Sequence, residues 1–159
     1  MVSTFTFPRS LALVAGLTVA AFGAPAFAGE CPADQAGVNP LADRMTEPSG
    51  VTDVVLGAID LAAEPANIQD RTFRLRRLEI QPGGVVPFHS HEDRPAQIYV
   101  VSGEIVEYSS DCLVPIVHKA GEVSTETHAV AHWWMNVGSE PAVLISADLL
   151  HQQIDDNVM

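Results

Sequence analysis

The chain has 159 residues, of which 47% are hydrophobic, and its 20 Asp and Glu residues outnumber 8 Lys and Arg residues to give a formal net charge of −12 at pH 7. This length suits one domain with a buried core. The acidic excess excludes electrostatic binding to nucleic acid or anionic lipid as the function. The 18% charged fraction argues against intrinsic disorder, and two cysteines are too few for a disulfide-dense scaffold or a four-cysteine zinc site.

Residues 1–28 have the pattern of a secretory signal peptide. Arg9 is the one charged residue of this segment, residues 11–23 form a short apolar run, and residues 26–28 read Ala-Phe-Ala, the small-x-small form of a cleavage site. The alternative is an N-terminal anchor or a buried helix, but the apolar run is too short to span a bilayer. We therefore expect an exported protein, secreted or periplasmic, with no membrane insertion after cleavage.

Residues 29–50 are expected to form an irregular arm or linker, because they are rich in Pro, Gly, Asp and Asn. Cys31 lies in this arm, and Cys112 lies in a later turn-like stretch, YSSDCLVP. In an oxidising compartment the two residues would pair and pin the arm to the domain. The alternative is two independent thiols.

Residues 51–159 predict a single all-β domain. Short apolar runs rich in Val, Ile and aromatic residues recur between Gly, Pro, Ser and Asp residues, as in FRLRRLEI, QIYVV, EIVEY, HWWMNV and AVLISADLL. Runs of this length and spacing are typical of antiparallel strands. Seven or eight of them indicate a small sandwich or a closed jelly-roll barrel.

Three histidines fall on the expected strands at a spacing that suits metal binding. His89 and His91 are two residues apart, so on a strand both imidazoles point to the same face. His132 opens another expected strand, and Trp134 shares its face. Three histidines on two strands can bind one divalent ion and leave positions open for water or substrate. A His-x-His pair also occurs without metal, so context has to decide.

The context resembles the two sequence motifs of the cupin superfamily, in the right order, over about residues 73–149. The matching positions are Gly83, His89, His91 and Gly103 for the first motif, then Gly121, His132 and Asn136 for the second. The resemblance implies a single jelly-roll (cupin) β-barrel after the irregular N-terminal arm. It also implies a metal bound by His89, His91 and His132, and a homodimer.

The chain departs from the cupin pattern at the metal-binding glutamate. Ala96 stands where the family usually keeps that residue, and Gln97 beside it would need a one-residue bulge to turn inward. His128, in an atypical turn before His132, is a candidate fourth ligand, a base near the metal or an exposed residue. The possible pocket residues are Gln97, Tyr99, His128 and Trp134.

Several other side chains allow both a functional and a structural interpretation. Arg94 could clamp a substrate carboxylate, although a surface ion pair with Glu92 or Asp93 is the simpler expectation. Trp133 is expected in the core, and Asn136 is expected to hold backbone geometry. His118 and His151 have no partner spacing and are interpreted as surface residues. The clustered arginines are expected to pair with acidic residues on an adjoining strand, and they are Arg71, Arg74, Arg76 and Arg77.

Two classes of function follow. The first is an exported metal-dependent enzyme, dioxygenase-like, that acts on a small polar or anionic metabolite with a divalent transition metal (Fe, Mn, Cu or Zn). The alternative is a non-catalytic periplasmic cupin that binds a small ligand or a metal. A barrel without any metal is a third possibility. Catalytic residues are not identified by the sequence, because the usual carboxylate is missing.

Overall fold

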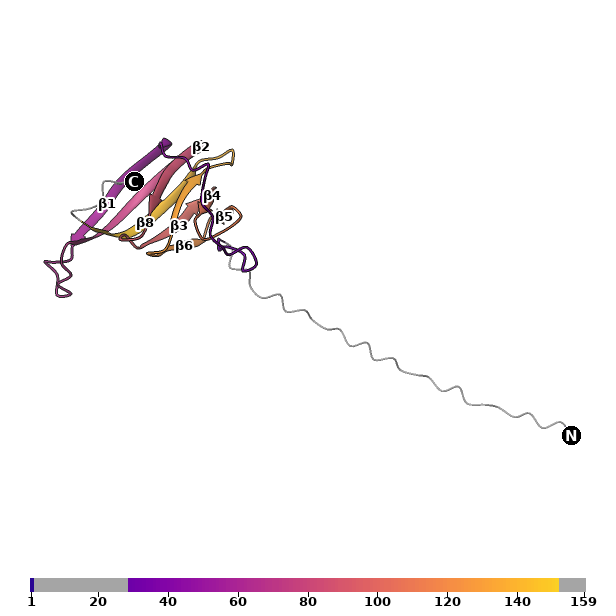
Figure 1. Ribbon diagram of the computed structural model, residues 1–159, viewed down its shortest axis with the longest axis horizontal. Helices are drawn as coiled ribbons and strands as arrows, with labels where there is room; N and C mark the ends of the chain where they lie inside the picture. The colour runs from indigo at the N-terminus through magenta and orange to yellow at the C-terminus, as the bar shows by residue number, and fades with distance from the viewer. Residues whose placement is uncertain (2–28, 152–159) are drawn as a thin grey trace.

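The computed structural model describes Met1 and residues 29–151, and every regular element in this part of the chain is a β-strand (Figure 1). The expected signal peptide therefore lies outside the described residues. Within the described ranges, no helix has the length and apolar character needed to cross a membrane. The strands are β1 (Ser49–Asp60), β2 (Arg71–Ser90), β3 (Ala96–Ser102), β4 (Glu104–Ser109), β5 (Ile116–Lys119), β6 (Val123–Glu126), β7 (Ala131–Met135) and β8 (Ala142–His151).

The strands form one curved antiparallel sheet with the order β5-β4-β7-β2-β8-β3-β6, and β1 pairs with β2 outside this path. Its two ends approach each other, since β3 and β5 are in contact, so the sheet is a nearly closed barrel. The all-β jelly-roll prediction is confirmed. The long strand β2 pairs along its first half with β8 and along its second half with β7, and this places the histidine motif beside His132.

The barrel interior is filled from alternate positions of the strands, as the period of two in β-structure requires. On β2, residues 74, 76, 78 and 80 are all buried, while residues 73 and 75 are exposed. The buried apolar core cluster comes entirely from β2, β3, β4, β7 and β8, and it consists of Leu78, Ile80, Val86, Ile98, Val100, Ile105, Trp134, Ala142 and Leu144. The side chains of His89, His91 and His132 are buried as well.

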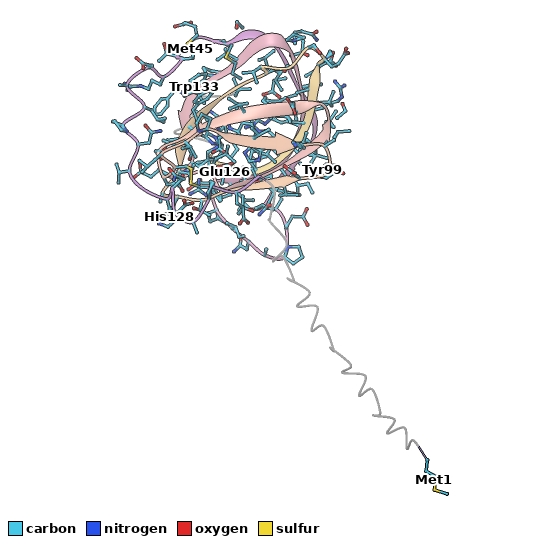
Figure 2. The ribbon with its side chains drawn as sticks, turned by 90° about the vertical axis from the view of Figure 1, so that its right-hand side faces the viewer. Met1, Met45, Tyr99, Glu126, His128 and Trp133 are labelled. Carbon is cyan, nitrogen blue, oxygen red and sulfur yellow. A yellow bond between two sulfur atoms is a disulfide. The ribbon has the colours of Figure 1, made fainter. Side chains whose placement is uncertain are left out.

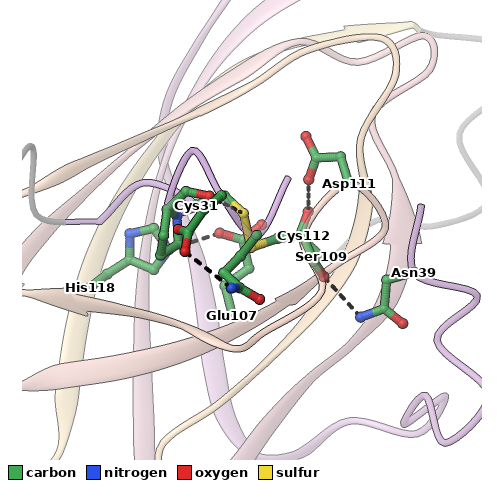
Figure 3. The surroundings of a disulfide bond; sticks show 10 residues. Cys31, Asn39, Glu107, Ser109, Asp111, Cys112 and His118 are labelled. Carbon is green, nitrogen blue, oxygen red and sulfur yellow. Dashed lines mark hydrogen bonds and ion pairs between the residues drawn. A yellow bond between two sulfur atoms is a disulfide. The ribbon is translucent and has the colours of Figure 1, made fainter. Parts of the chain in front are cut away.

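The N-terminal arm runs along the barrel surface and is fastened covalently. Cys31 and Cys112 form a disulfide with their Cα atoms 5.7 Å apart, which confirms the expected pairing (Figure 3). Backbone hydrogen bonds continue the attachment, from Gly37 N–H to Asp111 O at 2.9 Å and from Asn39 N–H to Ser110 O at 2.8 Å. The arm is therefore part of the folded domain.

Gly103 and Asn136 fix the geometry of two turns. Gly103 joins β3 to β4 with φ of 76°, and a Cβ there would come within 2.7 Å of Pro141 O. Only glycine avoids both the left-handed strain and this clash. The Asn136 side chain donates to Ile80 O at 2.9 Å and to Glu140 O at 2.8 Å, and accepts from Gly138 N–H at 2.9 Å. The prediction that Asn136 holds backbone geometry is confirmed.

The arginine cluster pairs with acidic residues largely as expected. Arg74 forms a buried, bidentate ion pair with Asp148 on the adjoining strand β8. Arg76 pairs with Asp53 on β1, its neighbour on the other side. Arg71 and Arg77 differ, because Arg71 pairs with Asp93 in the segment between β2 and β3, and Arg77 pairs with Glu79 of its own strand. Two of these ion pairs therefore lie inside the barrel.

Candidate metal centre

The fold brings the three histidines together into one group, here called the three-histidine cluster (His89, His91 and His132). His89 and His132 are directly opposite each other in the β2–β7 pairing. Past the end of this pairing, the backbone N–H of His91 donates to Val130 O at 2.8 Å. The Nε2 atoms lie 3.1 Å (His89 to His91), 3.0 Å (His91 to His132) and 3.1 Å (His132 to His89) apart. All three residues are buried.

Each imidazole is oriented by an acceptor at its other nitrogen. The Nδ1 of His89 lies 2.8 Å from Pro87 O, the Nδ1 of His91 lies 2.7 Å from Arg94 O, and the Nδ1 of His132 lies 2.7 Å from Glu107 Oε1. Because carbonyl and carboxylate oxygens only accept, the proton of each ring sits on Nδ1. Three Nε2 lone pairs then face one another, and a cation between them removes their repulsion. Histidine ligands in metal sites are held in this way.

The pKa values of two cluster members favour this unprotonated state. Burial lowers the pKa of His89 well below its usual value, and the neighbouring His132 and His91 lower it further. Burial, together with His132, lowers the pKa of His91 to about 3. Both rings are therefore neutral at pH 7, and a neutral imidazole is the form that binds a metal.

His132 differs because carboxylates surround its Nδ1. Burial alone would lower its pKa, but Glu126 and Glu107 outweigh burial and raise it. Glu107 accepts a second hydrogen bond from His118 Nε2 at 2.8 Å, and the His118 ring stacks on Trp134 at 4.6 Å. These two histidine partners outweigh burial and lower the pKa of Glu107 to about 2. Glu107 is thus an ionised carboxylate that fixes His132.

A second buried carboxylate, Glu126, lies close to His132. Ala96 on β3 pairs with Glu126 on β6, so a carboxylate enters the barrel from the strand next to the expected one. Its Oε2 lies 3.4 Å from His132 Nδ1, on the side of the ring away from the three Nε2 atoms. Burial raises the pKa of Glu126. Glu107, Glu126 and His132 therefore form a second, acidic group that meets the three-histidine cluster at His132.

The spacing of the Nε2 atoms fits a single bound ion. Nitrogens about 2.1 Å from one ion lie about 3.0 Å apart at right-angle bond angles and about 3.4 Å apart at tetrahedral angles. The observed separations of 3.0 to 3.1 Å match the first case. His89, His91 and His132 would therefore provide a donor set that suits one divalent transition metal.

A small cavity of about 20 Å³ adjoins the cluster inside the barrel. His89, His91 and Trp134 line it together with Arg76 and Ser146, and apolar residues close the rest. Space of this size holds about one or two water-sized groups. Trp134, one of the possible pocket residues, is a lining residue of this cavity and also belongs to the apolar core cluster.

The other three pocket candidates lie outside this cavity. Gln97 is exposed on β3, where Thr125 donates a hydrogen bond to its side chain. Tyr99 is 45% exposed on the same outer face, and His128 is exposed in the turn before β7 (Figure 2). No bulge turns Gln97 inward, since the β3–β8 register shifts only after Val100. Strand alternation therefore keeps Gln97 and Tyr99 on the outer face.

Two predictions of surface positions are wrong. His118 is fully buried beside Glu107, because it follows Ile116 on the inward face of β5. Arg94 is 3% exposed and points toward Asp148 Oδ2 at 4.0 Å instead of pairing with Glu92 or Asp93. His151 is partly exposed and pairs with Asp93.

Sequence reasoning missed Glu107 and Arg76 as members of the site. A usable signal exists for both, because strand alternation puts Glu107 on the face of Ile105, and Arg76 on the face of Leu78 and Ile80. Charged residues at inward positions of a strand mark a buried polar function. Trp133, in contrast, stacks on Tyr108 at 4.0 Å and is buried away from the cluster.

Comparison with known proteins agrees with this geometry. The family model for a cupin domain matches residues 76–148, which span the strands from β2 to β8 and include the whole cluster. The chain belongs to the cupin superfamily. This confirms the family resemblance drawn from the two histidine motifs.

Curated relatives share part of this cupin domain. The auxin-binding protein ABP19a of Prunus persica is 28% identical over 97 residues, which cover 58% of this chain and 46% of that protein. ABP19b of the same species is 31% identical over 85 residues, which cover 52% and 41%. The chain thus spans less than half the length of these relatives.

Solved structures share the fold. The Cnp3 cupin domain of Schizosaccharomyces pombe has a TM-score of 0.52 at 14% identity, covering 69% of this chain and 72% of that one. A predicted oxalate decarboxylase of Thermotoga maritima has a TM-score of 0.51 at 20% identity, covering 71% and 97%. An oxalate oxidase in complex with the substrate analogue glycolate has a TM-score of 0.50 at 23% identity, covering 67% and 54%. At these identities the likeness describes the fold alone.

Proposed function

We propose that this cupin binds one divalent transition metal through His89, His91 and His132 and acts on a small polar or anionic metabolite in a dioxygenase-like reaction. The observation that carries the proposal is the convergence of three Nε2 lone pairs at 3.0 to 3.1 Å, each ring being fixed through Nδ1. Without a cation this buried arrangement is repulsive, so its construction is best explained by metal binding.

The chemistry follows from the neutral donor set. A bound divalent ion supplies Lewis acidity and open positions for oxygen-containing ligands. Because Ala96 adds no carboxylate, three neutral imidazoles would leave the bound ion with its full positive charge. That charge would favour the binding of anionic or chelating ligands. Glu107 holds the Nδ1 proton of His132, and Trp134 with the apolar wall excludes bulk water. The oxalate oxidase of the same fold binds glycolate, a small acid of the class proposed here.

The metal content of the protein beginning at Gly29, purified without a histidine tag, tests this function. We expect about one transition-metal ion per chain in the wild type, and its loss in the double variant His89→Ala/His132→Ala. The matched control is His128→Ala, because His128 is exposed and should leave the metal content unchanged. Absence of metal after reconstitution with excess ions would overturn the proposal. Iron would direct the search to oxygen consumption, and zinc to hydrolytic substrates.

A non-catalytic cupin that binds a small ligand or metal in the periplasm is the second candidate. It is favoured by one observation: the buried carboxylates of Glu107 and Glu126 lie on the Nδ1 side of His132, so neither carboxylate faces the cavity as a general base. Turnover separates the two functions. A binding protein would retain its ligand stoichiometrically, whereas an enzyme would consume it together with any co-substrate.

Export to the periplasm or the outside of the cell is also a proposal. It is supported by the charge, apolar run and Ala-Phe-Ala site of residues 1–28 and by the Cys31–Cys112 disulfide, since such bonds persist in oxidising compartments. Expression of the full chain, cell fractionation and N-terminal sequencing would test it. A mature protein that begins at Gly29 outside the cytoplasm is expected, and an uncleaved cytoplasmic protein would contradict the proposal.

A homodimer is proposed as well. The outer face of the sheet carries apolar side chains that are between 38% and 46% exposed, namely Phe73, Leu75, Tyr99, Val101 and Val123. Pairing two such faces would bury apolar surface away from the acidic charge of the chain. Light scattering should give twice the monomer mass for the wild type and a smaller mass for Phe73→Ser/Tyr99→Ser. A monomeric wild type would refute the proposal.

A further inference from the structure

We infer that Arg76, supported by Ser146, is an anion-binding subsite next to the three-histidine cluster, and that the ligand of this site is a small carboxylate. The inference deepens the proposed function and rests on it. It assigns a ligand class and a specificity-determining residue to the cavity beside the proposed metal.

Arg76 occupies a particular place in this cavity. Among the residues that line it, Arg76 is the one permanent cation, and Ser146 is a second polar lining residue. Arg76 and two members of the cluster, His89 and His91, thus line the same small volume. The remaining lining residues are Leu78, Val86, Ile98, Trp134 and Leu144.

The guanidinium is held firmly but retains a donor without a partner. Arg76 is 5% exposed. Its Nη1 pairs with Asp53, and its Nη2 lies 3.3 Å from Asp148 Oδ2 and 3.4 Å from Ser146 Oγ. Its Nε–H is buried and has no hydrogen-bond partner in the described part of the chain. A buried donor left unpaired costs free energy that a bound acceptor would recover.

A carboxylate is the ligand chemistry that meets these conditions. It offers two acceptor oxygens and a negative charge, which suits a guanidinium and a cation held by neutral histidines. The apolar wall lowers the local dielectric and strengthens both attractions. A neutral alcohol or amide of the same size lacks the charge and would bind more weakly.

The size of the cavity restricts the carboxylate to a small one. About 20 Å³ corresponds to one or two water-sized groups. The carboxylate of a small acid displaces that number of waters. The carboxylate-binding role that the sequence suggested for Arg94 therefore belongs to Arg76, because Arg94 does not line this cavity.

Formate binding, measured by calorimetry on the metal-loaded protein, tests the inference. Arg76→Lys keeps the charge and removes the planar fork, and we expect it to weaken formate binding about 10- to 100-fold. Ser146→Ala should weaken binding to a lesser degree. The matched control is Arg77→Lys, since Arg77 lies next to Arg76 in sequence but is 42% exposed in its ion pair with Glu79, and it should bind as the wild type does. Formamide, the neutral isostere, should not compete with formate.

The inference is overturned if Arg76→Lys retains its metal and binds formate as tightly as the wild type, or if formamide binds as well as formate. Circular dichroism establishes whether Arg76→Lys folds, because this residue also pairs with Asp53 and Asp148. If it does not fold, Ser146→Ala and the comparison of formate with formamide decide the question.

Metal content, measured on every sample, separates the two proposals. A wild type without metal defeats the proposed function, and formate binding to the metal-free protein then tests Arg76 by itself. A wild type that holds metal but shows no dependence on Arg76 defeats only the present inference.

Discussion

Replacement of Glu107 by glutamine tests the central electrostatic argument, because this one carboxylate joins two buried histidines. Glu107 accepts from His132 Nδ1 at 2.7 Å and from His118 Nε2 at 2.8 Å. A glutamine of the same shape can accept only at its oxygen, so its NH₂ group would face the His118 nitrogen. His118 would then have to move its proton to Nδ1, which is buried and has no partner in the described residues.

The magnitude follows from the pKa of Glu107, which the two histidines lower to about 2 from 4.5. A depressed carboxyl pKa contributes stability that is present above the unfolded pKa and is lost as the pH falls through the folded pKa. The difference corresponds to on the order of 3 kcal/mol at pH 7, of which about half remains at pH 3. The deficit of Glu107→Gln relative to the wild type should therefore shrink with falling pH.

Metal binding provides an independent measurement of the same variant. Loss of an acceptor that orients a metal-binding histidine lowers metal affinity about 10- to 100-fold. Competition with a chelator measures this affinity, and denaturant unfolding of the metal-free protein at pH 7 and pH 3 measures stability. Glu104→Gln is the matched control, since Glu104 is exposed at the start of the same strand. Equal stability and equal metal affinity in Glu107→Gln and the wild type would refute the reasoning.

Three further predictions concern the framework and the cluster. Asn136→Ala removes three hydrogen bonds to backbone groups and should cost about 2–4 kcal/mol in denaturant unfolding, whereas Val137→Ala at the exposed neighbouring position should cost under 1 kcal/mol. Reduction of Cys31–Cys112 should lower the free energy of unfolding by up to about 4–5 kcal/mol, since the loop spans 81 residues; unchanged unfolding in reductant would show that the disulfide does not stabilise the domain. Metal binding should weaken as the pH falls, because protons compete with the ion for the ligand nitrogens and His132, whose pKa is raised, takes up a proton before the other two ligands, whose pKa values are lowered; chelator competition at neutral and mildly acidic pH measures this, and a metal affinity that does not change with pH would contradict the assignment.

The expectations made from the sequence were most successful where local periodicity carries the information. Strand alternation and glycine-marked turns predicted the barrel, and the His-x-His spacing predicted that His89 and His91 share a face. They were least successful for isolated charged residues. The partners of His118 and Arg94 are Glu107 and Asp148, which lie on other strands, so the order of residues along the chain did not reveal these contacts.

The sequence by itself determined the all-β fold and the three histidines as a candidate metal site, because both depend on residue types at short, regular spacings. It also determined the cysteine pair, because the chain has only two cysteines. Tertiary structure alone decided which other side chains surround the site. Glu126 lies inside the barrel opposite Ala96, and Arg76 reaches the cavity, because strands distant in sequence become neighbours only when the sheet closes. Buried electrostatics depends on distances between strands, and a linear pattern does not contain those distances.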